Sequence, residues 1–146
     1  MARITVHLHG RPKDKALRMV IEEFARRLSG RGVKLLCHED KSSDDFEGRL
    51  LNLNGNLILL DESGISMNSI EFSKLIAEVS LASSDLEFAV ASADGFSEAM
   101  RQNSTSLLSL SKMTMPHELA AAVLMEQLYR ASEINRGSPY HRQERE

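Results

Sequence analysis

An alternation of short apolar runs with amphipathic segments is the feature that most limits how this chain can fold. Runs with the residue content of strands stand at positions 3–8, 33–37, 56–60, 86–91 and 106–110. Segments with the apolar spacing or the boundary residues of helices stand at 14–28, 68–81, 96–103 and 116–134. Strands that alternate with helices in this way predict an α/β fold, a mostly parallel sheet with helices on both faces.

Length and composition predict one cytoplasmic domain. We expect residues 1–146 to form a single domain with one core, because this length suits one. No apolar run approaches the roughly 18 residues that span a bilayer. The one cysteine, Cys37, cannot form an internal disulfide, so a reducing cytoplasm is the expected location. A small buried hydrophobe is the expected role of this cysteine.

The formal net charge of -3 hides an uneven distribution. Residues 1–34 hold nine Lys and Arg residues against three acids, whereas residues 35–125 hold five against fourteen. A basic N-terminal third suits contact with the phosphates of nucleic acid, or it is a solvated helix face. Charge alone favours the second interpretation.

The ends of three predicted strands are the places to look for a ligand site. Sheets of this type bind ligands at the carboxyl ends of their strands, which here are Leu60-Asp61, Ala91-Ser92 and Leu110-Ser111. The segment SLSKMTMPHEL, residues 109–119, follows the third end directly and opens the longest predicted helix with Pro116. It is therefore a candidate ligand loop. The sequence contains no Cys/His cluster with zinc spacing, no Walker-type loop and no glycine-rich dinucleotide fingerprint.

Several motifs together resemble one known family. The run LSLSKMTMPHELAAAVLMEQLYRASEINRGSPYHR, residues 108–142, carries S-K-M-T-x-P-H, E-Q-x-Y-R-A and P-Y-H-R elements in the order and spacing of the RlmH family. The run LLDESGISMNSIEFSKLI, residues 59–76, is similar to the L-D-x-x-G-K-x-x-S-S-x-E-F segment of that family. RlmH proteins are SPOUT-class methyltransferases that methylate a pseudouridine in large-subunit ribosomal RNA. The resemblance covers residues 57 to 142, and the N-terminal half matches only in layout.

The resemblance implies a fold, an activity and partners. It implies a trefoil knot (the SPOUT, or α/β-knot, fold) at the C-terminal end of the sheet, and a homodimer through the final helix. It also implies transfer of a methyl group from S-adenosyl-L-methionine to the ring nitrogen N3 of a pseudouridine in 23S rRNA, with the ribosome as substrate and neither metal nor membrane involved. An apolar stripe on the final helix agrees with a dimer and comprises Leu119, Ala122, Val123 and Leu128.

Site residues follow from the same resemblance, position by position. Tyr140, His141 and Arg142 match the family's C-terminal motif, which faces the active site across the dimer. In this assignment His141 accepts the proton of the ring nitrogen, Arg142 stabilises the anion or holds a phosphate, and Tyr140 stacks on a base. Arg130 is a further candidate for binding RNA phosphate. The positions that match the family's cofactor site are Leu60, Ala91, Leu110, Ser111, Lys112, Met113, Thr114 and Met115.

The chain departs from the family at one turn. A G-G-x-x-G element appears here as Ala91-Ser92-Ala93-Asp94-Gly95. Ala91 and Ser92 are strained if the missing glycines held positive φ, and they narrow the cofactor pocket if those glycines allowed a close approach. Two other functions therefore stay open at this point: a non-catalytic SPOUT dimer that binds RNA or the ribosome, and a methyltransferase for another RNA site.

Overall fold

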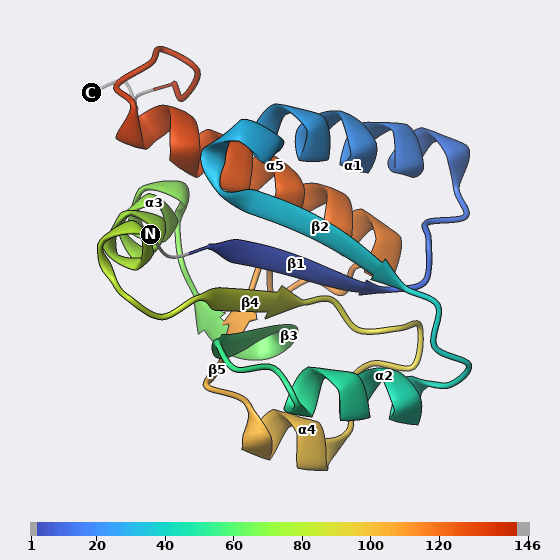
Figure 1. Cartoon of the computed structure of the whole chain (residues 1–146). Coiled ribbons are helices and arrows are strands. Elements are labelled where there is room, and N and C mark those ends of the chain that lie inside the picture. Colours follow the sequence, from blue (N-terminus) through green and yellow to red (C-terminus); the bar gives the residue numbers. More distant parts are fainter. Residues whose placement is uncertain (1–2, 143–146) are drawn as a thin grey trace.

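The computed structural model describes residues 3–142 and confirms the predicted α/β fold (Figure 1). Five strands and five α-helices alternate along the chain, with a short 3-10 turn, η1 (Ser29–Arg31), after the first helix. The strands are β1 (Ile4–His9), β2 (Val33–His38), β3 (Asn56–Ser66), β4 (Leu86–Ala89) and β5 (Ser106–Ser109). The helices are α1 (Lys15–Leu28), α2 (Ser43–Leu51), α3 (Ser69–Leu81), α4 (Glu98–Asn103) and α5 (His117–Asn135).

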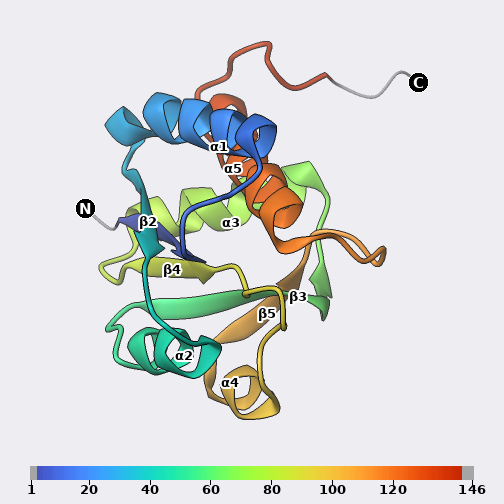
Figure 2. The ribbon, with the colours of Figure 1, turned by 90° about the vertical axis from the view of Figure 1, so that its right-hand side faces the viewer.

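The strands form one parallel sheet in the order β2-β1-β4-β3-β5. Helices α1, α3 and α5 cover one face of this sheet, and α2 and α4 cover the other (Figure 2). All four residues of the central strand β4 are buried, because helices pack on both of its faces. Phe88 of β4 packs against Phe72 of α3, with ring centroids 5.9 Å apart. Ala89 belongs to a separate cluster of buried apolar side chains, which lies between the sheet and the helices α2 and α4.

Local capping chemistry places the starts of the helices. The Asp14 side chain accepts a hydrogen bond from the N–H of Leu17 and begins α1. Asn68 and Glu71 form a reciprocal capping box at the start of α3. Pro116 directly precedes the first residue of α5. These caps explain why the predicted helix starts at 14, 68 and 116 agree with the structure to within a residue.

The segment after Leu60 differs from the prediction. We expected a loop there, because Asp, Ser and Gly are typical turn residues, yet β3 continues to Ser66 with an irregular register against β5. Gly64 allows this pairing: a Cβ at this position would lie 2.5 Å from the carbonyl carbon of Leu107. Close approach of two backbones, rather than a turn, therefore explains this glycine.

Two other expectations change. Cys37 is exposed rather than buried, because it lies on the edge strand β2. Strand β4 ends at Ala89, so Ala91 lies in the following turn.

Within residues 3–142, no helix is long and apolar enough to cross a membrane. The threading of the chain as a trefoil knot stays a prediction from the family resemblance.

Candidate functional site

A cavity of about 710 Å³ lies at the carboxyl ends of β4 and β5, beside the middle of β3, and we call it the β3–β5 cavity. Its wall comes from residues 60–62 of β3, residues 90–96 after β4 and Arg101 of α4. Leu110, Ser111, residues 113–117 and Ala120 close the remaining side. The volume lies within the range of about 300–1,000 Å³ that small-molecule and cofactor sites occupy.

Seven of the eight residues matched to the family's cofactor site line this cavity. They are Leu60, Ala91, Leu110, Ser111, Met113, Thr114 and Met115. Lys112 is exposed and is not part of the cavity wall. Residues far apart in the sequence meet here because the parallel strands β4 and β5 end beside Leu59 and Leu60 of the longer strand β3. Their role in binding a cofactor stays a prediction.

Hydrogen bonds from small hydroxyl side chains shape the loop after β5. The hydroxyl of Ser109 donates to the carbonyl oxygen of Ser111 at 2.9 Å, and the Ser111 hydroxyl accepts from the N–H of Met113 at 3.0 Å. Thr114 donates to a carboxylate oxygen of Glu62 at 2.9 Å and ties the loop to β3. Met113 leaves 79% of its surface exposed on this loop. The hydroxyl residues thus fold the turn and leave the large apolar side chain of Met113 exposed.

The turn at residues 91–95 is unstrained. Among the described residues, positive φ angles occur only at glycines, and Gly95 is one of them, with φ +77°. Ala91 and Ser92 therefore occupy ordinary backbone conformations, which excludes the strain that the missing glycines suggested. The Ser92 hydroxyl lies 2.8 Å from that of Ser43 in α2. What remains of this difference from the family is the presence of two side chains, those of Ala91 and Ser92, in the cavity wall.

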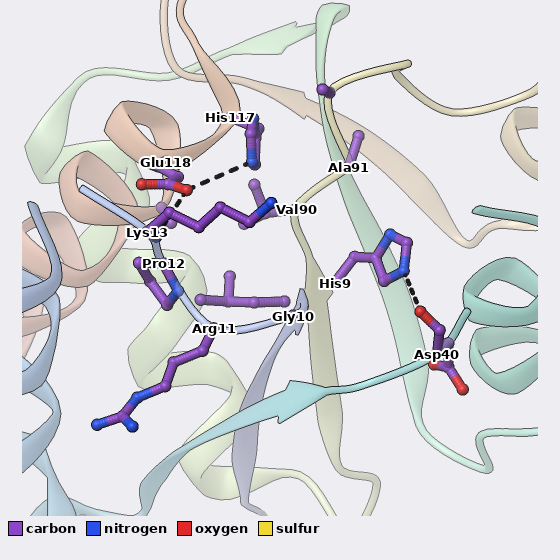
Figure 3. Close-up of a pocket in the computed structure, with 13 residues that line it drawn as sticks. His9, Gly10, Arg11, Pro12, Lys13, Asp40, Val90, Ala91, His117 and Glu118 are labelled. Atoms are coloured by element: carbon purple, nitrogen blue, oxygen red, sulfur yellow. Dashed lines mark hydrogen bonds and ion pairs between the residues drawn. The ribbon is translucent and has the colours of Figure 1, made fainter. Parts of the chain in front are cut away.

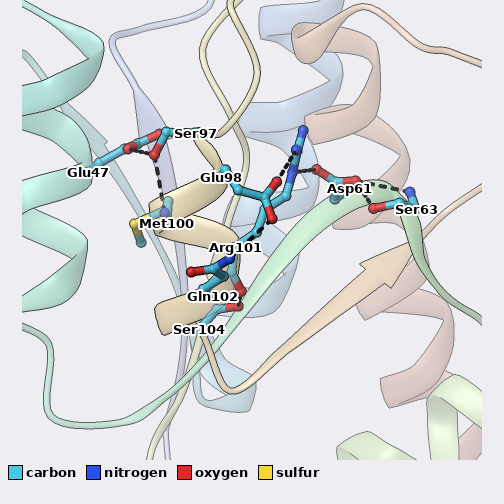
Figure 4. Close-up of polar contacts among 9 residues, drawn as sticks. All are labelled: Glu47, Asp61, Ser63, Ser97, Glu98, Met100, Arg101, Gln102 and Ser104. Atoms are coloured by element: carbon cyan, nitrogen blue, oxygen red, sulfur yellow. Dashed lines mark hydrogen bonds and ion pairs between the residues drawn. The ribbon is translucent and has the colours of Figure 1, made fainter.

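An ion pair holds α4 against β3 beside the same cavity (Figure 4). The Arg101 Nε–H donates to Oδ2 of Asp61 at 2.9 Å, and the N–H and hydroxyl of Ser63 donate to Oδ1. Burial acts to raise the pKa of the Asp61 carboxyl, but hydrogen bonds from Ser63 and Arg101 outweigh it and lower that pKa. On α2, Glu47 accepts from the N–H and hydroxyl of Ser97, which begins α4. Short α4 is therefore fixed from two sides.

A second cavity, of about 360 Å³, lies between the ends of β1 and β4 (Figure 3). We call it the β1–β4 cavity. It shares Val90, Ala91, Ala93 and His117 with the β3–β5 cavity, so the two spaces have a common wall. Sequence reasoning did not single out its other residues as a group, because only the strand order brings the ends of β1 and β4 together.

The loop after β1 is held in place by polar contacts. Gly10 has φ +81°, and its N–H donates to the carbonyl oxygen of His38 at 2.7 Å. Glu118, in the first turn of α5, accepts from the N–H groups of Lys13 and Asp14, each at 3.0 Å. The hydrogen bond from Lys13 is the main reason that the pKa of the Glu118 carboxyl is lowered. This carboxylate therefore joins the start of α1 to the start of α5.

The two histidines that flank Leu8 have different environments. His9 lines the β1–β4 cavity, and its Nε2 donates to the carbonyl oxygen of Asp40 at 2.8 Å. His7 is buried, with Nε2 2.7 Å from Glu87 and Nδ1 2.8 Å from Nε2 of His38. Within residues 3–142, no group of three or more His, Cys, Asp or Glu side chains is arranged to hold a metal ion.

The C-terminal candidate residues form a separate cluster at the far end of α5. Arg130 lies 3.1 Å from Nδ1 of His141 and donates to Glu126 at 2.8 Å. The Tyr140 hydroxyl donates to the same Glu126 carboxylate at 2.9 Å, and burial followed by this bond raises the pKa of Tyr140. Arg142 is exposed. Glu126 was missed, since a Glu and an Arg four residues apart are a common helix pair.

The C-terminal cluster does not meet the cavities within one chain. Arg130 is thirteen positions beyond His117 on the same helix, which is roughly 20 Å along the axis at about 1.5 Å per residue. The structure therefore brings Tyr140 and His141 to Arg130, but it leaves all three away from the β3–β5 cavity.

Comparison with known proteins agrees with this architecture. Residues 2–141 match a family described as Predicted SPOUT methyltransferase. A probable methylase family protein from Haemophilus influenzae shares the fold at a TM-score of 0.57 and 11% identity, over 99% of this chain and 72% of that one. The class is thus that of the SPOUT methyltransferases.

Curated relatives narrow the class to one family. Ribosomal RNA large subunit methyltransferase H from Prochlorococcus marinus subsp. pastoris is 36% identical over 140 residues, which is 96% of each chain. The protein of the same name from Clostridium botulinum is 37% identical over 158 residues, covering 95% of this chain and 99% of its own. The chain belongs to the RlmH family of SPOUT methyltransferases.

Proposed function

We propose that this protein is a cytoplasmic, S-adenosyl-L-methionine-dependent methyltransferase that methylates N3 of a pseudouridine in 23S rRNA. The ribosome is the proposed substrate, and the proposed working form is a homodimer. The names of the relatives support the large-subunit RNA as target. The observation that carries the proposal is the convergence of seven expected cofactor residues on the β3–β5 cavity.

The residues around the β3–β5 cavity suit an adenosine-containing cofactor. When bound, S-adenosyl-L-methionine supplies an electrophilic methyl group on its sulfonium. The backbone N–H and C=O groups of residues 110–116 can bond the edges of adenine, while Leu60, Leu110 and Met115 pack on its faces. The ordinary backbone of Ala91 and Ser92 means that no strain has to be relieved for binding.

Proton removal falls to the C-terminal cluster in this proposal. The ring nitrogen of pseudouridine must lose a proton to accept a methyl group. Because a guanidinium only donates hydrogen bonds, Nδ1 of His141 accepts from Arg130, and the neutral imidazole then carries its proton on Nε2. His141 can act as the base only when Nδ1 is released. Binding of Arg130 to an RNA phosphate would release it and leave Arg142 to stabilise the anion.

A homodimer would bring the C-terminal cluster and the β3–β5 cavity together, although they lie apart within one chain. We expect the C-terminal residues of one subunit to reach the β3–β5 cavity of its partner. Of the predicted apolar stripe, Ala122 and Leu128 are buried within the chain, whereas Leu119 is 39% exposed. Apolar surface is also exposed at Ile65 of β3, at Ile70 of α3 and at Met67 between these elements. Exposed apolar surface of this kind supports a contact between subunits.

Calorimetry and a methylation assay together test the proposal. The purified protein should bind S-adenosyl-L-methionine and methylate ribosomes from a strain that lacks the gene, with the product located by mass mapping of the 23S rRNA. No detectable binding at millimolar cofactor would reject the enzyme and leave the non-catalytic RNA-binding dimer. Methylation at any other nucleotide would keep the chemistry and reject the proposed target.

A further inference from the structure

The β1–β4 cavity lies at the topological switch point of the sheet. Strands β1 and β4 are neighbours. After β1 the chain turns toward β2 on one side, and after β4 it proceeds to β5 on the other. In open α/β sheets, ligands bind in the crevice that such diverging connections leave at the carboxyl ends of the strands. The β1–β4 cavity occupies this crevice and is distinct from the β3–β5 cavity.

The common wall limits which ligand suits the second cavity. Methyl transfer requires the reacting atoms to approach to about 3–3.5 Å. Val90, Ala91, Ala93 and His117 line both cavities, so a ligand in one lies beside a ligand in the other. A space of about 360 Å³ is at the small end for ligand sites, which run from about 300 Å³ upward. It suits one nucleotide rather than a longer segment of RNA.

Among residues 3–142, the charged groups around the β1–β4 cavity leave one cation without an ion pair. Arg11 pairs with Glu22 at 3.2 Å, and its side chain points away from the cavity (Figure 3). Asp40 pairs with Arg49 at 2.9 Å. The Glu118 carboxylate is bonded by two backbone N–H groups, as described above.

Lys13 is that available cation. Its side chain reaches across the cavity toward Val90 in Figure 3, and its ammonium makes no ion pair with any residue between 3 and 142. A lysine ammonium in this position suits an anion, and RNA brings one with every nucleotide.

The His9 ring offers a surface for a base. It stacks on Phe46 at 5.0 Å with an interplanar angle of 10°, and its Nε2 is bonded to the carbonyl oxygen of Asp40. The ring is thus held in one orientation at the cavity wall. Aromatic and histidine rings fixed in this way stack on unpaired bases in RNA complexes.

We propose that the β1–β4 cavity binds the acceptor nucleotide, with its pyrimidine base against His9 and its phosphate on Lys13. This inference rests on the proposed function and adds the subsite that receives the RNA. Charge on Lys13 then contributes to substrate binding, while the methyl donor occupies the adjoining β3–β5 cavity.

Uridine 5′-monophosphate is a direct probe of this subsite. Its binding to the full-length protein can be followed by NMR titration, in the presence of S-adenosylhomocysteine. We expect Lys13→Gln to raise the Kd of the mononucleotide about tenfold, the usual loss with one charge-assisted hydrogen bond, and Lys13→Arg to restore most of the binding. Arg11→Gln is the matched control, because Arg11 lies on the same loop but turns to Glu22; its Kd should stay within about twofold of the wild type.

Three measurements separate this proposal from its rivals. The Kd of S-adenosyl-L-methionine should not change in Lys13→Gln, and an increase would show that Lys13 binds the donor's carboxylate instead. In the ribosome assay, the KM of Lys13→Gln should rise more than its kcat falls. Absent mononucleotide binding to the wild type, or equal binding by Lys13→Gln, would overturn the subsite. The titration decides this even if the wild type methylates no ribosomes, a result that would reject the proposed function alone.

Discussion

The two ends of α5 differ in how their functional residues are held. At the His117 end, loops from β1, β3, β4 and β5 surround two adjoining cavities, so the geometry is set by the sheet. At the other end, Tyr140 and His141 are held mainly by Glu126 and Arg130 on a single helix. The first arrangement is complete within one chain. The second has its donors and acceptors paired with each other, and we infer that it becomes functional against a partner subunit.

Pairing two defective subunits gives the largest expected effect. His141→Ala and Ala91→Phe, the latter filling the shared cavity wall, should each lower turnover by at least about 100-fold, in line with the loss of a general base. A dimer that contains one subunit of each kind keeps one intact pairing of cavity and C-terminal cluster, and should recover about half of the wild-type turnover. The mixed dimer is obtained by co-expression with two different affinity tags.

Dimers of a single variant, purified in the same way, are the control for this experiment. They should stay inactive. A mixed dimer without activity would mean that each subunit uses its own C-terminal residues. The C-terminal end of α5 would then not act against a partner subunit. We also expect His141→Ala to lower turnover far more than it raises the Kd of the cofactor, since the proposed role of His141 is to accept a proton from the RNA base.

Gly64→Ala should destabilise the cavity end by about 3 kcal/mol, the upper part of the usual range for overpacking. The new Cβ would lie 2.5 Å from backbone atoms of β5, which cannot rotate away as a side chain can. Urea unfolding measures the loss. Gly48→Ala is the control, because a Cβ there meets nothing within 4 Å and the residue lies inside α2; it should be neutral or stabilising by up to about 1 kcal/mol. Equal stability of the two variants would contradict the close approach.

Acid and alkali should weaken opposite ends of the helix. The pKa of Glu118 is lowered in the folded protein, so its stabilisation is present above its ordinary value of 4.5 and disappears as the pH falls below it. The pKa of Tyr140 is raised, so its stabilisation is present below the ordinary value of 10.0 and disappears as the pH rises through the folded value.

Two variants can test whether Glu118 causes the loss of stability in acid and whether Tyr140 causes the loss in alkali. Glu118→Gln should lower the free energy of unfolding at pH 7 by about 1–2 kcal/mol, as expected for hydrogen bonds to a charged group, and reduce the loss of stability in acid. Tyr140→Phe should reduce only the loss in alkali. Chemical unfolding across the pH range measures both, and an unchanged acid limb in Glu118→Gln would remove this carboxylate as its source.

Restoring the family's two glycines should have the smallest effect. Because Ala91 and Ser92 have no positive φ, Ala91→Gly and Ser92→Gly should each cost about 0.4–1 kcal/mol of stability through greater freedom of the unfolded chain. The Kd of S-adenosyl-L-methionine should change by less than about threefold, in keeping with small contributions per methyl group. A gain of tenfold or more in calorimetry would show that these side chains narrow the cavity.

Periodicity and capping residues were sufficient to predict the alternation of elements. The buried run before Leu60 and the cap at Asn68 each act through neighbours in sequence, so a pattern can reveal them. The continuation of β3 to Ser66 was not predictable in this way, because it depends on pairing with β5, in which the partner Leu108 lies 43 positions after Ile65. Gly64 appeared to mark a turn for the same reason: the backbone that passes beside it is distant in sequence.

The candidate site was predictable only where the rule that ligands bind at the carboxyl ends of parallel strands applied. Strand ends identify Leu60, Ala91 and Leu110 as neighbours of a ligand once the sheet is known to be parallel. The β1–β4 cavity needs the order of the strands as well, which local patterns do not contain, so Lys13 and His9 were not grouped. Glu126 could not be identified from the sequence either. Its pairing with Arg130 looks like a common helix pair, and its bond to Tyr140 forms only because the chain folds back along α5 after the helix ends.

His117 lies between the two cavities and Glu118 lines the β1–β4 cavity next to it, and this arrangement has a thermodynamic consequence. Glu118 fixes the loop after β1 to the first turn of α5, and His117 forms part of both walls. Any ligand that shifts this turn changes the affinity of the other cavity, and by reciprocity the second ligand changes the affinity of the first by the same factor. With the proposed donor and acceptor in these cavities, one helical turn would produce cooperativity between them, whichever binds first.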